Sequence, residues 1–367
     1  MPARIENLDD ELMKDAAYRT LKRREEIKRT QHLISHGRGY EAETQERLKQ
    51  YTYRQYRLMA EGMETPLVKI ADEAIELVEE PTAEDISLER VIGPTTDFLS
   101  IEFLEAGLLA ARSVGRINIG GTSGTGFHVG HQILLTNHHV IDSPDTAALA
   151  NFELNVEENR FGVPQQEFIY SLNPDRFFLT DKTLDFTLVA IEEVPEEPID
   201  QFGWHVLLKE LGKIRKGDVV NIIQHPNGGN KQIVLHNSHL LDHYNGNDDG
   251  QYYLYSGDTA KGSSGAPVFN TRWEVIALHH KGVPKTNKNG EIIDIHGRAM
   301  TEDRMNKHPE DVAWKGNEGI RIIPIVEFIE NAKLDNQEQE EIRDALIALW
   351  EASGAHRRGL KAAENNS

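Results

Sequence analysis

Three short segments of the chain carry residue types that together can perform nucleophilic chemistry. Ser264 lies in the Gly- and Ser-rich stretch 262–265, and it is preceded along the chain by the histidines His138 and His139 and by Asp185. A serine hydroxyl is a poor nucleophile at neutral pH, so it needs a base, and an imidazole suits that role. A buried carboxylate can fix the imidazole tautomer and stabilise its protonated form. The order His, Asp, Ser therefore predicts an acyl-transfer site.

There is a separate physical reason for a glycine at position 262. The backbone N–H groups of Gly262 and Ser264 are expected to converge on the oxyanion that develops during acyl transfer, and this needs a turn that bulky residues resist. The stretch then continues into the apolar residues 266–269, which a flexible Gly-Ser linker does not usually do. The sequence predicts a nucleophile loop that enters a strand.

The elements that would position these residues are short and β-rich from residue 116 onward. Gly, Asn, Asp and Pro separate them. Many short strands with turn signals favour an all-β barrel or sandwich. The expected strands are 116–119, 126–129, 132–136, 185–191, 218–223, 232–241, 252–256, 267–270 and 274–280.

Helices are expected on both sides of this β-rich region. Charged and apolar residues at helical spacing predict helices over 11–34 and 41–59, which a breaker at 36–39 would fold into an antiparallel hairpin, and a further helix over 66–80. These helices encode no chemistry and could be a solvated extension or a docking module. After the β region, helices are expected over 324–332 and 336–350, the second with the apolar stripe Ile342, Leu346 and Leu349 and with Trp350 beside it; the tail after residue 354 is expected to be disordered.

Composition limits the class of protein. The 367 residues carry a formal net charge of −20 and include no cysteine. The negative charge argues against nucleic acid or an anionic membrane as a partner, and the missing cysteines fit a reducing compartment or a bacterial source. The first ten residues contain no apolar run, and no stretch approaches the ~20 apolar residues of a membrane span. The expected location is cytoplasmic.

The motifs resemble those of bacterial trypsin-like serine peptidases, which have the chymotrypsin fold. Residues 136–140 match the pattern T-x-x-H-V, in which the histidine before the valine is catalytic, so the resemblance implies His139 rather than His138 as the base. Within 258–321 the chain resembles the glutamyl endopeptidase branch. The resemblance covers about residues 116–330 and implies two orthogonally packed six-stranded β-barrels with the active site between them. The fold class expected is thus mainly β, a chymotrypsin-like double β-barrel with an N-terminal α-helical extension and C-terminal helices.

The resemblance also implies a function. It is that of a cofactor-free serine endopeptidase acting on protein or peptide substrates through an acyl-enzyme. Ser264 would be the nucleophile, His139 the general base and acid, and Asp185 the orienting carboxylate. Bacterial peptidases of this build sometimes act in stress or antiviral responses, and the same analogy suggests such a role here. The alternative is a catalytically silent interaction or scaffold protein, which has no physical reason to keep the whole set intact.

Substrate specificity stays open between an acidic preference, a basic preference and neither of them. In the glutamyl endopeptidase branch a histidine fifteen residues after the serine and a hydroxyl five before it bind an acidic side chain, and His279 and Thr259 match. Lys261 would help, whereas Asp258 stands where trypsin-like enzymes hold the carboxylate that selects Arg or Lys. The remaining expected substrate-binding residues are His280, Gly282 and Gly319, with His280 placed in the substrate-binding strand rather than in the chemistry.

The organisation expected along the chain has three parts. These are an N-terminal helical region (1–95), a trypsin-like protease domain (96–332) and a C-terminal helix with its tail (333–367). Ser263 occupies the position of the aspartate that binds a new N-terminus in chymotrypsin-type zymogens, so that switch is not available, and we expect the N-terminal helices or a partner bound to them to control activity. No metal is expected: His236, His239 and His243 would alternate on a strand, and 245–250 lacks the closing carboxylate of a calcium loop.

Overall fold

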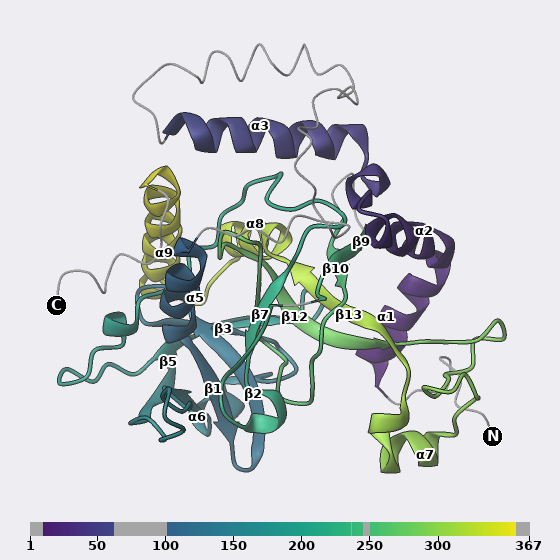
Figure 1. Ribbon diagram of the computed structural model, residues 1–367. Helices are drawn as coiled ribbons and strands as arrows, with labels where there is room; N and C mark the ends of the chain where they lie inside the picture. Colours follow the sequence, from purple (N-terminus) through teal and green to yellow (C-terminus); the bar gives the residue numbers. More distant parts are fainter. Residues whose placement is uncertain (1–9, 62–100, 236, 245–249, 357–367) are drawn as a thin grey trace.

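The computed structural model describes residues 10–61, 101–235, 237–244 and 250–356. The helix expected over 66–80, His236 and most of the 245–250 loop lie outside the described residues, as does the tail from residue 357. The described chain is mainly β, with a closed barrel, a second curved sheet, and helices at both ends (Figure 1). This confirms the predicted chymotrypsin-like double-barrel fold class. No helix in the described residues is long and apolar enough to cross a membrane.

The first barrel is formed by six antiparallel strands. They close in the order β1-β2-β3-β6-β5-β4, with Ile117 of β1 opposite Phe152 of β4. Ile117 and Phe152 are fully buried inside it together with Leu134 and Val189. Strands β3 and β6 are buried along their whole length, because their alternate side chains belong to two different core clusters. Helix α6 (Pro144–Ala148) follows β3. The strands are β1 (Val114–Ile119), β2 (Thr122–His128), β3 (Ile133–Thr136), β4 (Asn151–Leu154), β5 (Phe168–Asp181) and β6 (Phe186–Ile191).

The second sheet has seven strands in the order β8-β7-β11-β12-β13-β10-β9. The single strand expected over 232–241 is two strands, because β8 pairs with β7 while β9 pairs with β10. The segment before β7 also bonds to the segment before β9, with Val220 N donating to Ser238 O at 2.9 Å. The sheet therefore curves back toward itself as a partly closed second barrel. Its strands are β7 (Asn221–Gln224), β8 (Gln232–Val234), β9 (Leu240–Tyr244), β10 (Tyr252–Tyr255), β11 (Pro267–Phe269), β12 (Val275–Pro284) and β13 (Trp314–Arg321).

Three further helices of the described chain cover the barrels. Helix α5 (Glu102–Arg112) precedes β1, while α8 (Ile322–Asn331) and α9 (Gln337–His356) follow β13. In α9 the buried apolar side chains of the described residues are Leu346 and Trp350, and the Trp350 indole donates to Val129 O at 2.8 Å. Both residues belong to the same core cluster as strands of both barrels. A short helix, α7 (Glu302–Lys307), lies in the loop before β13.

The N-terminal helices lie against the second sheet (Figure 1). The helix expected over 11–34 is broken at Arg23 into α1 (Glu11–Lys22) and α2 (Arg24–Ser35), and α3 (Gln45–Glu61) follows a 3₁₀ turn, Gly39–Ala42. Arg23 leaves helical geometry where its side chain reaches Asp242 on β9. Docking is close, since a Cβ on Gly39 would lie 2.9 Å from Gly217 Cα.

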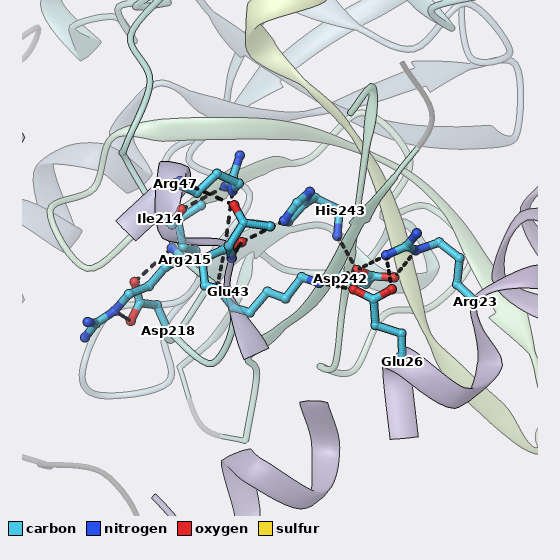
Figure 2. A network of polar contacts seen from close by, with 11 residues as sticks. Arg23, Glu26, Glu43, Arg47, Ile214, Arg215, Asp218, Asp242 and His243 are labelled. Atoms are coloured by element: carbon cyan, nitrogen blue, oxygen red, sulfur yellow. Dashed lines mark hydrogen bonds and ion pairs between the residues drawn. The ribbon is translucent and has the colours of Figure 1, made fainter. Parts of the chain in front are cut away.

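Buried ion pairs line this interface. Glu43 and Asp242 are the carboxylates at its centre, and Arg23 and Arg47 of the N-terminal region face them (Figure 2). Lys216, only 1% exposed, contacts Asp242 at 2.9 Å. A buried charge is tolerated only when it is paired, so the helices and the sheet each supply charges that the other needs.

Candidate active site

Asp185 and His139 meet at the edge of the first barrel. Asp185 comes just before β6 in a left-handed conformation (φ 41°), which a short polar residue tolerates better than a bulky one. The Asn137 amide donates to Asp185 O at 2.8 Å and holds this turn. The Asp185 carboxylate then accepts the His139 backbone N–H on Oδ1 at 2.9 Å and His139 Nδ1–H on Oδ2 at 2.7 Å. A carboxylate on Nδ1 leaves Nε2 as the atom that can take a proton.

The neighbouring His138 points elsewhere. Its Nδ1 contacts the Thr180 hydroxyl of β5 at 2.8 Å. The structure thus brings His139, and not His138, to Asp185. A quarter of the His139 side-chain surface is exposed, whereas Asp185 is buried, so the imidazole faces solvent from a buried anchor.

The loop that carries Ser264 packs on β2, across from the segment that carries His139. Ser264 O accepts from Thr125 N at 2.8 Å. A Cβ added to Gly124 would meet both Val140, the residue after His139, and Ser264 O. The hydrogen bonds of the described residues include none between the Ser264 hydroxyl and His139. His139 and Asp185 are therefore in direct contact, and Ser264 approaches them through the packing of its loop.

Gly262 adopts a backbone that requires glycine. Its φ is +93°, and a Cβ there would lie 2.8 Å from His225 O and 2.9 Å from Gly228 N. Gly262 O accepts from the Thr125 hydroxyl at 2.8 Å, which fixes the peptide that follows it. Ser263 is fully buried, and its hydroxyl accepts from Ala260 N at 3.1 Å.

His280 is a site residue whose contact with Asp185 the sequence did not predict. It lies on β12 as expected, but its Nδ1 donates to Asp185 Oδ2 at 2.7 Å, so the same oxygen accepts from His139 and His280. Because side chains alternate along a strand, the sequence indicates that His279 and His280 point to opposite faces. This pattern does not indicate which of the two faces meets Asp185, which lies 95 residues earlier in the chain.

The hydrogen bonds from His139 and His280 keep Asp185 ionised. Burial alone would raise the pKa of Asp185, but the hydrogen bonds from His139 and His280 outweigh it and hold the pKa well below the usual range of an aspartate. The carboxylate can therefore accept from both imidazoles throughout the neutral range. Such a perturbed group beside an exposed imidazole is typical of a catalytic site.

These residues are also the only metal-ligand cluster found among the described residues. One ligand atom each from His139, Asp185 and His280 lies within 4.8 Å of the others. Their hydrogen bonds account for this proximity, because both Nδ1 atoms donate to the carboxylate that a metal would have to share. Of the other histidines considered, His239 is half-buried and His243 contacts Glu43 at 2.9 Å.

The expected specificity residues have different surroundings. His279 is buried and its Nδ1 contacts the Tyr255 hydroxyl at 2.7 Å; burial lowers its pKa to about 3, so it is neutral. Thr259 donates to Asn317 Oδ1 at 2.7 Å. Asp258 and Lys261 are exposed. A neutral imidazole can recognise a carboxylate only as a hydrogen-bond donor, and not as a cation.

The two expected pocket glycines lie on neighbouring strands. Gly282 on β12 lies under the ring of Trp314, which a Cβ would meet at 2.9 Å. Gly319 on β13 faces the Tyr255 ring and Ala277, each 3.1 Å from an added Cβ. At both positions a residue larger than glycine would therefore collide with an aromatic ring.

Residues 124–278 match the family model of the trypsin-like peptidase domain, a segment that contains His139, Asp185 and Ser264. The match supports a trypsin-like serine peptidase. It does not concern the glutamyl endopeptidase branch, which stays a prediction.

Similar proteins include one curated relative with no assigned function. The uncharacterized protein y4fB of Sinorhizobium fredii (strain NBRC 101917 / NGR234) is 38% identical over 255 residues, which cover 65% of this chain and 38% of that protein. The chain thus spans about two fifths of the length of the curated relative it matches. Among solved structures, Deg5 has a TM-score of 0.37 and 19% identity, with 50% of this chain and 87% of that chain covered. The HtrA-type protease AlgW with a tripeptide has a TM-score of 0.39 and 16% identity, with 62% and 64% covered.

Proposed function

We propose that the chain is a serine endopeptidase that cleaves protein substrates through an acyl-enzyme. The observation that carries the proposal is the pair of hydrogen bonds from the His139 backbone N–H and Nδ1–H to one buried carboxylate, Asp185. This arrangement fixes the tautomer in which Nε2 is free to accept a proton. The match of residues 124–278 to the trypsin-like peptidase domain supports the same reaction class.

The reaction follows from these roles. Ser264 Oγ attacks the carbonyl carbon of the scissile peptide, and its proton passes to His139 Nε2 while Asp185 stabilises the imidazolium. The N–H groups of Gly262 and Ser264 bind the oxyanion. The tetrahedral intermediate collapses, His139 gives its proton to the leaving amine, and an acyl-enzyme remains. Water, deprotonated by the same base, then hydrolyses the ester and restores Ser264.

The charge preferred at the cleavage site is the finer part of the proposal. His279 and Thr259 favour an acidic side chain held by hydrogen bonds, and exposed Asp258 favours a basic one. Profiling cleavage of a denatured proteome separates these two preferences from each other. Cleavage mainly after Leu or Phe excludes both.

The direct test is labelling of the nucleophile with a fluorophosphonate probe. The wild type is expected to be labelled, and Ser264→Ala is expected to lose labelling and peptidase activity completely. Ser263→Ala is the matched control: it should still be labelled, because the Ser263 hydroxyl is buried and bonded to Ala260 N rather than facing the site.

The competing function is a catalytically silent scaffold with the same fold. A wild type that no fluorophosphonate labels under any condition supports the scaffold. Control of the site by the N-terminal helices, and a role as a bacterial stress or antiviral effector, belong to the same proposal. Proteins trapped by Ser264→Ala in cells identify the natural substrate and test that role.

A further inference from the structure

Helix α1 inserts a cation next to the candidate active site. Arg19, in the last turn of α1, donates through Nε to Glu318 Oε2 at 3.0 Å and through Nη2 to Oε1 of the same carboxylate. Glu318 lies on β13 and its side chain is fully buried, while that of Arg19 is 14% exposed. The Arg19 guanidinium also stacks 4.1 Å above the ring of Tyr252. This is a bidentate, nearly dry ion pair, the geometry in which arginine differs most from lysine.

Glu318 in turn faces His280. Its Oε1 lies 3.6 Å from His280 Nε2, and its Oε2 accepts from the Tyr244 hydroxyl at 2.6 Å. His280 Nε2 is buried and makes no hydrogen bond among the described residues, and the Glu318 carboxylate lies beside it. His280 therefore stands between two carboxylates, bonded to Asp185 through Nδ1 and facing Glu318 through Nε2.

The hydrogen bond from His280 to Asp185 depends on how well the charge of Glu318 is neutralised. A buried carboxylate that loses its cation must find another donor. With Arg19 in place, Glu318 is satisfied by the guanidinium and by Tyr244. Without Arg19, the imidazole 3.6 Å away is the polar group that can supply a donor to Glu318. A neutral imidazole has one N–H, so a proton on Nε2 that bonds Glu318 is a proton taken from Nδ1, and the bond from His280 to Asp185 is lost.

We propose that Arg19, Glu318 and His280 form a positioning relay through which docked helix α1 holds Asp185 in the orientation that activates His139. The three are positioning residues, since none touches the substrate, and the inference rests on the proposed peptidase function. Helix α1 is then part of the catalytic apparatus, and turnover requires it to be docked.

The two ends of α1 are fixed to the strands that carry the relay. Asp10, the N-cap of α1, pairs with Lys281, the neighbour of His280 on β12, at 2.5 Å. Near the other end, Lys315 of β13 donates to Thr20 O at 2.9 Å. Docking of α1 and placement of Arg19 are therefore one event.

The test compares two arginines of the N-terminal region in the full chain. Arg19→Met is expected to lower kcat about tenfold to a hundredfold with KM changed by less than about threefold, because misplaced catalytic groups lower the rate more than substrate binding. Arg23→Met is the matched control: Arg23 also pairs with a buried carboxylate, Asp242, but that carboxylate is held by Lys216 as well and does not face His280. The kcat of Arg23→Met should equal that of the wild type. All rates are divided by the concentration of active sites, measured by titration with a fluorophosphonate.

A second variant separates positioning from a structural role. An asparagine at position 280 offers an N–H at about the place of Nδ1 but cannot reach Glu318. His280→Asn should keep more of kcat than His280→Phe, and in the His280→Asn background Arg19→Met should change kcat by less than about twofold. Arg19→Lys keeps the charge but not the bidentate contact, so its kcat should lie between those of the wild type and Arg19→Met. It replaces Arg19→Met in the test if that variant does not fold.

The outcomes are distinct. Equal kcat in Arg19→Met and Arg23→Met, or an Arg19→Met effect that persists undiminished with His280→Asn, overturns the relay and leaves the peptidase proposal standing. A wild type without Ser264-dependent turnover overturns the peptidase proposal and the relay with it. Loss of kcat specific to Arg19 that vanishes with His280→Asn supports the relay.

Discussion

At the scale of single residues, the candidate site depends on Asp185. Its carboxylate accepts three N–H donors, two from His139 and one from His280, and its left-handed backbone turns the side chain toward them. A carboxylate with this many donors cannot rotate without losing several bonds at once. The imidazole of His139 is therefore oriented before any substrate binds, which is what lowers the cost of reaching the transition state.

Gly262 offers a residue-scale prediction. Gly262→Ala forces a Cβ to within 2.8 Å of His225 O and 2.9 Å of Gly228 N at a φ of +93°, so the loop must move and the oxyanion N–H with it. We expect kcat/KM to fall roughly a hundredfold or more. Steady-state kinetics with a cleaved peptide measure this.

The control for Gly262→Ala is a glycine with similar backbone and open surroundings. Gly290 has a φ of +74° and no atom within 4 Å of an added Cβ. Gly290→Ala should cost about 1–2 kcal/mol of stability and leave kcat/KM unchanged. Equal activity of the two variants would exclude a role of the Gly262 peptide in catalysis.

How much of the site the sequence predicts depends on how local each contact is. The order of His139, Asp185 and Ser264 indicates the chemistry, because each follows or precedes an apolar run that is readable alone. The contact of His280 with Asp185 spans 95 residues and depends on how two barrels pack, which no local pattern reports. Arg19 and Glu318 are 299 residues apart, and the same reason applies.

At the scale of elements, the strand pattern is readable because each strand is short and apolar between turn residues. The helix break at Arg23 is not readable, because no Gly or Pro marks it and the contact of Arg23 with Asp242 spans 219 residues. The same holds for α9: its apolar stripe is visible in the sequence, but the burial of Leu346 and Trp350 in one core cluster with the barrels is a long-range result.

Helix α9 therefore should matter for the stability of the barrels. Trp350→Ala removes a 2% exposed indole and its hydrogen bond to Val129 O, and we expect a loss of about 3–5 kcal/mol in the free energy of unfolding. Chemical denaturation followed by circular dichroism measures it. The exposed Glu340→Ala on the same helix should stay within about 0.5 kcal/mol of wild type. A comparably small effect of Trp350→Ala would mean that α9 is dispensable for the fold.

At the scale of the whole molecule, the N-terminal helices and the second sheet share one set of buried charges. Glu43, with a fully buried side chain, accepts from His243 Nε2 at 2.9 Å and from Lys216 N at 3.1 Å, and pairs with Arg47 at 3.3 Å (Figure 2). Burial alone would raise the pKa of Glu43, but the bond from His243 and the charge of Arg47 lower it to about 2. Burial lowers the pKa of His243, which favours its neutral form as donor.

This network makes docking of the N-terminal helices sensitive to acid. A carboxyl group whose pKa falls from 4.5 in the unfolded chain to about 2 in the folded chain stabilises the fold fully above pH 4.5, and that stability is lost as the pH falls toward 2. The contribution at neutral pH is about 3 kcal/mol. Glu43→Gln should therefore be less stable than wild type by about this amount at pH 7, with the difference shrinking between pH 4.5 and 2.

Denaturation at a series of pH values measures that difference, and hydrogen exchange in α2 and α3 locates it. Glu46→Gln, an exposed change in the same region, should show no difference from wild type at any pH. A Glu43→Gln deficit that stays constant from pH 7 to 3 would mean that Glu43 contributes through packing rather than through its charge. A stability difference that shrinks with acid, together with hydrogen exchange that rises first in α2 and α3, assigns the acid sensitivity to the ion-pair network between the N-terminal helices and the second sheet.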